Sequence, residues 1–209
     1  MNRQIVVTNL PQGALGPEHF ELQEVQAPAP GPGEVLLRVI VMSIDAANRS
    51  WLQGATYRDA VQPGDAMPTY AVCEVVASES PRLSPGDLVL AEAVWADHVV
   101  RPAHKVQKVP RVAPLTHLLS VYGIAGKTAF HGLMQIGQPL AGETIVVSAA
   151  AGSVGGYVGQ IGKALGCRVV GIAGGPEKCS YAVDQLGFAA CVDYRAGSVF
   201  KALRTACPD

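Results

Sequence analysis

The stretch Thr144-Ile145-Val146-Val147-Ser148-Ala149-Ala150-Ala151-Gly152-Ser153-Val154-Gly155-Gly156 decides the fold. Its first five residues have the composition of a buried strand, and beyond them Val154, Val158, Ile161 and Leu165 recur with the helical period. A diphosphate can approach backbone amides where no Cβ intervenes, and helix N-termini favour anions. The stretch therefore predicts a strand, a dinucleotide-binding loop and a helix. The alternative is that the glycines serve only close packing of helix on strand.

The same alternation of strand and helix continues downstream. We expect a strand over Cys167 to Ala173, a helix from Pro176 to Gly187, a strand over Ala189 to Val192 and a helix from Val199 to Pro208. Upstream, helices are expected near Leu115 to Tyr122 and Thr128 to Gln135. This order predicts a parallel sheet with right-handed crossovers.

The first half of the chain has a different pattern. Short β-like runs, such as Ile5 to Thr8 and Val35 to Met42, are separated by dense proline and glycine. This spacing is typical of an antiparallel, barrel-like fold. We therefore expect two domains, residues 1–120 and 121–209, and a fold class of β followed by α/β.

Composition excludes several classes of protein. The chain has 209 residues, 16% of them charged, and a net charge of −1, as in ordinary soluble globular proteins. Balanced charge argues against binding to nucleic acid or anionic membranes. No apolar run approaches the roughly 18 residues of a membrane span, and no secretory leader is expected at the N-terminus. The expected location is cytoplasmic.

Zinc is not expected. The five cysteines are widely spaced, with no Cys-x-x-Cys pair, and are interpreted as small buried hydrophobes. The five histidines are scattered and have no ligand spacing, so each is interpreted as a surface or core residue.

The second predicted strand indicates the cofactor type. NAD-binding proteins usually place an acid at its end, but here the sequence reads Gly171-Ile172-Ala173-Gly174-Gly175. Lys178 follows at the start of a helix and could reach a 2′-phosphate. This favours NADP. The alternative for Lys178 is a solvated surface lysine.

These residues carry a family resemblance. Residues 142–155 and 171–178, with Leu186-Gly187-Phe188, closely resemble the prostaglandin reductase (leukotriene B4 dehydrogenase-like, NADP-dependent alkenal/one oxidoreductase) branch of the medium-chain dehydrogenase/reductase superfamily. Gly33-Glu34-Val35-Leu36 and Pro85-Gly86-Asp87-Leu88-Val89 fit as well. The resemblance implies a GroES-like β-barrel domain followed by a Rossmann doubly wound parallel sheet. It also implies reduction of activated carbon–carbon double bonds by NADPH, without zinc.

The resemblance also implies site residues. Gly152, Ser153, Val154 and Gly155 match the family's pyrophosphate loop, and Gly174 belongs to the matching second stretch. Lys178 and Tyr194 match its 2′-phosphate lysine and the tyrosine beside it. Without the family, Tyr194 could equally pack under the next helix. Thr128 resembles a threonine near the nicotinamide, although a helix N-cap would explain it almost as well.

Two departures from the family stand out. Ala47, in Asp45-Ala46-Ala47-Asn48-Arg49, replaces a tyrosine of the family's substrate pocket, which puts the substrate class in doubt. The strand–helix series stops at Pro208-Asp209, where the family's fourth strand would begin. The chain thus resembles the first two-thirds of a family member, with a partial Rossmann sheet. We expect the 209 residues alone to be a weak catalyst or none.

The expected reaction of the whole enzyme is hydride transfer to the β-carbon of an α,β-unsaturated ketone or aldehyde. The developing enolate needs a donor, for which Tyr57, Tyr70, Asn48 and the ribose hydroxyls are candidates. An NADPH quinone reductase is an alternative, because Asn48-Arg49 is similar to that sister branch. A protein that binds NADPH without turnover is another. The expected partner is a small enone-type molecule, and a homodimer is left open.

Overall fold

The computed structural model describes residues 1–207, which form two compact units. The first comprises Met1–Leu119, and the second begins at Ser120. Each unit is described by itself. Within residues 1–207, no helix has both the length and the apolar character needed to cross a membrane.

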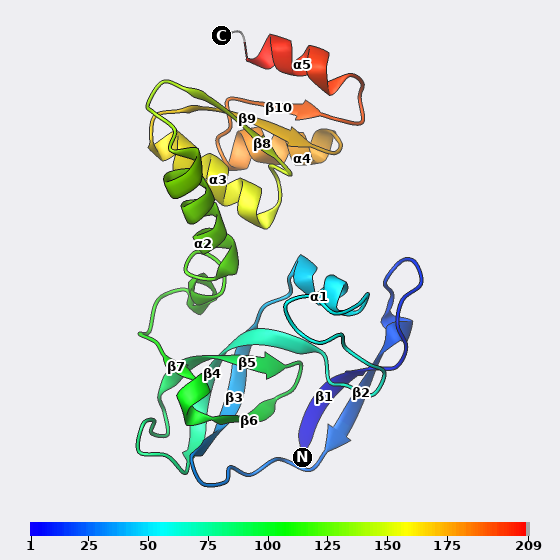
Figure 1. Cartoon of the computed structure of the whole chain (residues 1–209), viewed down its shortest axis with the longest axis vertical. Coiled ribbons are helices and arrows are strands. Elements are labelled where there is room, and N and C mark those ends of the chain that lie inside the picture. Colours follow the sequence, from blue (N-terminus) through cyan, green and yellow to red (C-terminus); the bar gives the residue numbers. More distant parts are fainter. Residues whose placement is uncertain (208–209) are drawn as a thin grey trace. The chain divides into compact units, whose positions relative to one another are not determined.

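The first unit is an antiparallel β structure with one short α-helix (Figure 1). Strands β6, β3, β4, β5 and β7 form one sheet in that order, and β1 pairs with β2 in a separate hairpin. Its strands and helix are β1 Asn2–Val7, β2 Phe20–Val25, β3 Glu34–Met42, α1 Ala46–Trp51, β4 Pro68–Ser78, β5 Leu88–Val94, β6 His98–Pro102 and β7 Gln107–Lys108. Three short 3-10 helices cover Pro17–His19, Ala103–Lys105 and Leu115–Leu118.

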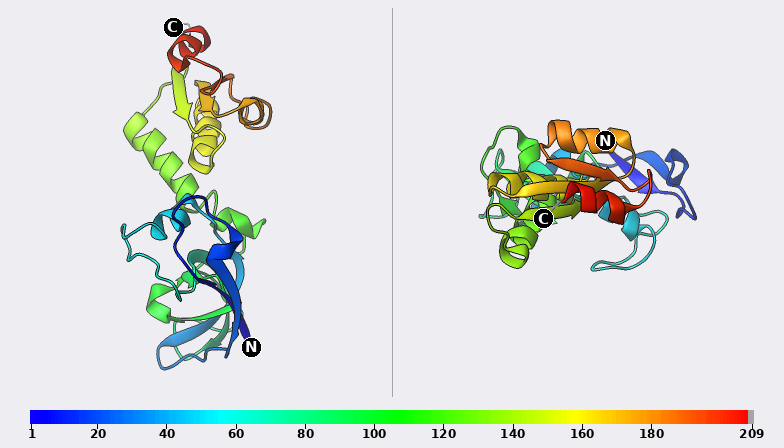
Figure 2. Two further views of the ribbon diagram at one scale, coloured as in Figure 1. Left: turned by 90° about the vertical axis from the view of Figure 1, so that its right-hand side faces the viewer. Right: turned by 90° about the horizontal axis from the view of Figure 1, so that it is seen from above.

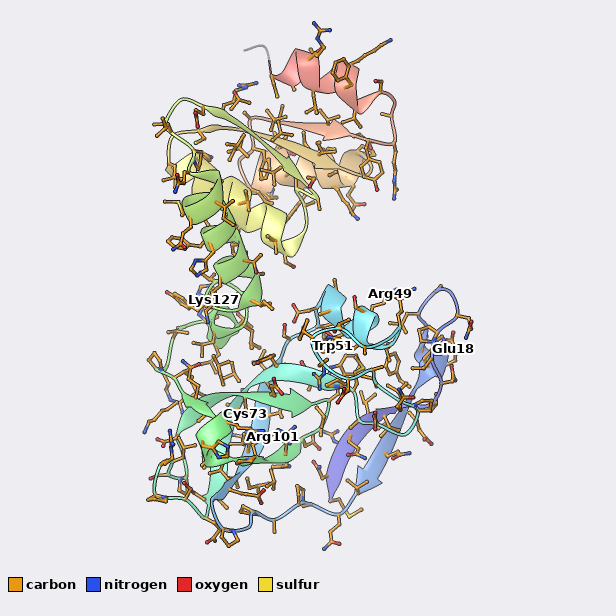
Figure 3. All side chains as sticks on the ribbon, viewed as in Figure 1. Glu18, Arg49, Trp51, Cys73, Arg101 and Lys127 are labelled. Atoms are coloured by element: carbon orange, nitrogen blue, oxygen red, sulfur yellow. The ribbon has the colours of Figure 1, made fainter. Side chains whose placement is uncertain are left out.

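Alternating side chains of the long strands build the core of this unit. Val35 and Leu37 on β3 pack with Cys73 and Val89 from the neighbouring strands, all fully buried. Burial raises the pKa of the Cys73 thiol to about 12, although the Arg101 guanidinium opposes the shift. Cys73 and Arg101 are labelled in Figure 3. Cys73 is therefore a small core hydrophobe, as expected from the sequence.

The second unit is a three-stranded parallel sheet with helices (Figure 1). The strand order is β10-β9-β8, which is the 3-2-1 order of one Rossmann half. Its elements are α2 Ile124–His131, β8 Thr144–Ser148, α3 Ser153–Ala164, β9 Arg168–Ala173, α4 Pro176–Ser180, β10 Ala190–Asp193 and α5 Val199–Ala206. The predicted fold class, β followed by part of a doubly wound sheet, is confirmed.

Three predicted helices differ from the structure. The helix expected from Pro176 to Gly187 is α-helical over Pro176–Ser180 and continues as the π-helical segment Tyr181–Gln185. The segment from Leu115 to Tyr122 is helical only as the 3-10 turn Leu115–Leu118, where Leu118 alone is buried. The helix expected over Thr128 to Gln135 begins earlier, at Ile124, and continues through the π-helical segment Gly132–Gly137 as one rod (Figure 2). Gly126 favours this early start, because it packs against the backbone of Val121, where a Cβ would overlap the Val121 carbonyl oxygen.

Helix α3 lies close against the sheet because its inner face consists of glycine. A Cβ on Gly159 would overlap the Phe188 ring, and one on Gly162 would overlap the Ile145 side chain. Both neighbours belong to the core beneath α3, with Val147 and Val169. Figure 1 shows α3 and α4 on one side of the sheet and α5 on the other.

We predict that Gly159→Ala lowers the free energy of unfolding of the second unit by about 1–3 kcal/mol, the usual cost of overpacking. The matched control is Gly132→Ala, which also adds one methyl group to a helix but has nothing within 4 Å of the new Cβ. This control should be neutral or stabilising by about 0.5–1 kcal/mol. Urea denaturation followed by circular dichroism measures both. Equal effects of the two changes would contradict the packing argument.

Candidate functional site

The turn between β8 and α3 presents an uncapped helix N-terminus. Ala149 adopts a left-handed conformation, with φ of 48°, and its carbonyl oxygen accepts the Gly152 N–H at 2.8 Å. Gly152 is the N-cap of α3, and no side chain caps the helix. The N–H groups of Ser153, Val154 and Gly155 occupy the first turn, where a helix has no internal acceptors for them. They therefore provide donors for an anion, which the helix dipole also favours.

Two glycines of this loop have different roles. A Cβ on Gly155 would overlap the Ala149 carbonyl oxygen, so Gly155 is needed for packing of α3 on the turn. Gly152 is exposed, and a Cβ there would lie 3.1 Å from the same oxygen. Thus the packing explanation applies to Gly155, whereas Gly152 leaves the N-terminus open to an approaching group.

Asp193 joins the loops that follow β9 and β10. Its Oδ1 accepts the Gly175 N–H at 2.8 Å and the Arg195 N–H at 2.9 Å. These two bonds, first that from Gly175, hold the pKa of Asp193 below its usual range. The Tyr194 N–H donates to Ala173 O at 3.1 Å, which extends the pairing of the strands by one residue. The two loops are therefore fixed to each other at the carboxyl edge of the sheet.

Tyr194 lies over the glycine turn that precedes α4. An ideal Cβ on Gly174 would be 2.5 Å from Tyr194 Oη, so only glycine leaves room for the phenol in this position. Tyr194 is 52% exposed, and the Arg195 guanidinium carbon lies 5.8 Å from its ring centroid. About half of Tyr194 is thus exposed, beside Gly174 and Arg195.

Lys178 adds a cation near the same edge. It is exposed in the first turn of α4, which begins immediately after Gly175. The structure thus places Gly174, Lys178 and Tyr194 on two loops that Asp193 connects, and Gly152, Ser153, Val154 and Gly155 on the adjacent β8–α3 turn. Carboxyl ends of neighbouring parallel strands are where open α/β sheets bind ligands.

Sequence reasoning missed Asp193 and Arg195. Both follow directly from the third strand, in Asp193-Tyr194-Arg195, and polar residues at a strand's carboxyl end were the available signal. Arg195 adds a second cation to the Lys178 and Tyr194 group.

Thr128 lies on a different element of the second unit. It is exposed inside α2, whose N-cap is Gly123. The alternative that Thr128 caps a helix is therefore wrong, because the helix begins four residues before it. Its assignment to a nicotinamide site stays a prediction.

In the first unit, the segment Asp45–Arg49 builds α1. Asn48 is buried, and its side chain accepts the Asp45 N–H at 2.6 Å and donates to Pro68 O at 2.9 Å. The Arg49 guanidinium donates to Gly13 O at 2.7 Å; Arg49 is labelled with Trp51 in Figure 3. Asn48 is therefore engaged in structural bonds, which weakens its candidacy as an enolate donor.

The two candidate phenols of this unit are exposed. Tyr70 Oη donates to Glu92 Oε1 at 3.2 Å, and partial burial followed by the Glu92 charge raises the pKa of Tyr70. Tyr57 packs edge-on against Trp51, with ring centroids 6.1 Å apart. Tyr70 is thus a neutral donor near neutral pH. As for metals, no group of three or more His, Cys, Asp or Glu side chains suited to an ion occurs in the described residues.

Comparison with known proteins supports a single family. A family model described as the N-terminal domain of oxidoreductase matches residues 3–109. The NADPH-dependent curcumin reductase of Escherichia coli (strain K12) is 42% identical over 209 residues, covering 99% of this chain and 61% of that protein. Prostaglandin reductase 1 of Oryctolagus cuniculus is 38% identical over 195 residues, covering 91% and 54%.

A solved structure agrees in three dimensions. The crystal structure of CurA in complex with NADPH from Vibrio vulnificus superposes with a TM-score of 0.89 at 40% identity, covering 99% of this chain and 62% of that one. The chain belongs to the medium-chain dehydrogenase/reductase superfamily, in its curcumin and prostaglandin reductase branch. Its two units are the GroES-like N-terminal domain of that superfamily and a partial Rossmann domain. It spans about three-fifths of the length of the curcumin reductase it matches.

We predict that stability depends on ionised Asp193. A carboxyl whose pKa is lowered by folding stabilises the protein above its unfolded pKa of about 3.9, and this contribution is lost as the pH falls through the lower folded value. Asp193→Asn keeps an acceptor oxygen without the charge, so its free energy of unfolding should fall less steeply below about pH 4 than that of the wild type. Urea denaturation across this pH range measures the difference.

The control is Asp59→Asn, which removes an exposed carboxylate from the first unit. It should follow the wild-type pH dependence of the second unit. If Asp193→Asn also shows the wild-type pH dependence of the free energy of unfolding, the two backbone hydrogen bonds do not influence the titration of Asp193.

Proposed function

We propose that the whole protein reduces activated carbon–carbon double bonds with NADPH, without zinc. The observation that carries this is an uncapped α3 N-terminus together with two exposed cations, Lys178 and Arg195, on the segments that follow β9 and β10, at neighbouring carboxyl ends of one parallel sheet. The first site suits a diphosphate and the second an extra phosphate. The named activities of the relatives support the same reaction class.

The residues present fit a dinucleotide phosphate. Gly152 is exposed with no side chain, so the cofactor's diphosphate can reach the N–H groups of Ser153 and Val154. Gly174 leaves the Tyr194 hydroxyl and the turn before α4 close together, so both can face one phosphate. Bound NADPH would supply the hydride that adds to the β-carbon of an unsaturated ketone or aldehyde.

Selection of NADP over NAD rests on charge at the end of β9. No carboxylate follows this strand, where Gly174 and Gly175 stand. Asp193, which ends β10, uses Oδ1 to accept two backbone N–H groups, one of them from Gly175. Lys178 and Arg195 can then offer their positive charges to a 2′-phosphate.

The first unit contains the candidate donors for the substrate. Tyr57 and Tyr70 are exposed and could donate to an enolate oxygen, which raises the rate by stabilising developing charge. Ala47, in place of a tyrosine of the family, removes one aromatic wall and favours a substrate with bulk on that side. The quinone alternative loses support from Asn48-Arg49, because both side chains hold α1 in place.

We predict that Lys178→Ala weakens NADPH binding by about 1–3 kcal/mol, the scale of a charge-assisted contact, and leaves NADH binding unchanged. Lys201→Ala, which removes an equal charge from the exposed face of α5, is the matched control and should leave both affinities unchanged. Isothermal titration calorimetry with each cofactor gives the four affinities. Equal losses for NADPH and NADH in Lys178→Ala would refute the assignment.

The proposed activity itself is tested with NADPH against a panel of enones and quinones. We expect cofactor consumption with unsaturated ketones and aldehydes, fastest in the full-length protein. Consumption with quinones alone would establish the quinone reductase, and cofactor binding with no turnover in the full-length protein would establish a non-catalytic binder. Addition of a chelator should leave the rate unchanged, because the proposed reaction uses no zinc.

A further inference from the structure

Two cysteines face each other behind the proposed 2′-phosphate subsite. Cys191 on β10 is paired in register with Gly171 on β9. A Cβ on Gly171 would lie 3.1 Å from Cys191 Sγ, so the Cys191 thiol lies over this glycine. Side chains alternate along a strand, so the Asp193 carboxylate, which accepts the N–H just before α4, is on the same face. Cys191 therefore faces the side of the sheet that α4 covers.

Cys179 faces the sheet from α4. Its N–H donates to Gly175 O at 3.2 Å, which places it one turn after the Asp193 contact. Ala182, in the π-helical segment Tyr181–Gln185 that continues α4, is fully buried in the core against which Cys191 packs. The Cys179 side chain is a hydrogen-bond partner and electrostatic neighbour of the Cys191 thiol.

The sequence-based prediction of five buried cysteines is wrong for three of them, this pair included. Cys73 and Cys167 are buried, whereas Cys179, Cys191 and Cys207 are partly exposed. A small oxidant can therefore reach the pair. Burial, and then the Cys179 thiol, raise the pKa of Cys191 to about 12, so Cys191 is protonated at neutral pH.

We propose that Cys179 and Cys191 form a redox-sensitive pair, which hydrogen peroxide converts into an intramolecular disulfide that weakens binding of the 2′-phosphate. The inference rests on the proposed function for its binding effect. The disulfide itself depends only on the placement of the two thiols.

The reaction balances in two steps. The Cys179 thiolate attacks one peroxide oxygen, breaks the O–O bond and becomes a sulfenic acid, and the hydroxide released takes up a proton to form water. The sulfur of Cys191 then attacks the Cys179 sulfur, losing its proton as the sulfenic oxygen departs as a second water. Two thiols lose two electrons, and peroxide is reduced by two. A dithiol reductant reverses the change by exchange.

The disulfide changes the subsite through Lys178, which directly precedes Cys179. A disulfide brings the sulfur atoms to about 2.05 Å, shorter than any non-bonded contact of two thiols. Closing this gap draws the first turn of α4 toward β10 and changes the position of the Lys178 backbone, which directly precedes Cys179. A displacement of about 1 Å at a positioning group is enough to lower the affinity for its ligand by one to two orders of magnitude.

The experiment treats the chain with hydrogen peroxide and measures mass and cofactor affinity before and after. We expect a loss of about 2 Da, a crosslinked peptide pair containing Cys179 and Cys191, and recovery with dithiothreitol. NADPH affinity should fall by about tenfold or more, with NADH affinity unchanged. Cys179→Ser and Cys191→Ser should each prevent the crosslink and keep NADPH affinity under peroxide. Cys207→Ser, which removes the remaining partly exposed thiol, should respond as the wild type does.

The outcomes separate this inference from the proposed function. The redox proposal is overturned if these peptides form no crosslink, or if the crosslink leaves NADPH affinity intact. The proposed function is unaffected by either result as long as the reduced protein binds NADPH. Failure of reduced protein to bind NADPH overturns the proposed function, and the crosslink then decides the disulfide alone. Because Cys179 is partly exposed, Cys179→Ser keeps the test valid if Cys191→Ser fails to fold.

Discussion

The close approach of α3 to the sheet is the constraint on which the second unit depends. At Gly155, Gly159 and Gly162 a Cβ would overlap the turn, the Phe188 ring and the Ile145 side chain in turn. Three positions spaced by four and three residues form one face of the helix, so the whole face lies against the strands. The helix cannot rotate or withdraw without opening a gap in the core. Its N-terminus is therefore held beside the carboxyl end of β8.

A second constraint fixes the loops that follow β9 and β10 to each other. Asp193 accepts N–H groups from Gly175, eighteen residues earlier, and from Arg195, two residues later. One carboxylate thus satisfies donors of two loops that would otherwise be independent. Lys178 and Arg195 are exposed at this edge, as is Glu177 beside Lys178. Asp193 stays ionised, because its two backbone hydrogen bonds lower its pKa, and it holds together the two loops that would receive a phosphate.

The sequence predicted what depends on local periodicity and failed where a role depends on distant partners. The alternation of strand and helix over β8, α3 and β9 could be predicted, because the apolar spacing and the glycine positions that indicate it lie within one short stretch of sequence. Helix α1 was not predicted, although Asp45 and Asn48 form its capping box. The β-like runs on either side led to a prediction of β structure throughout this half of the chain. Asp193 could not be assigned, since Gly175 becomes its partner only when β9 and β10 pair.

The two halves of the proposed cofactor site rest on anchors of unequal strength. Helix α3 has four buried glycines and is fixed by the core, whereas no residue of Pro176–Ser180 is buried. Helix α4 is held at its start by the Gly175 bond to Asp193 and on its inner side by Cys179 near Cys191. Changes at these contacts therefore move Lys178 while leaving the α3 N-terminus in place. If the proposed site binds the cofactor, discrimination between NADP and NAD would therefore change while affinity for the shared diphosphate, and the fold, are retained.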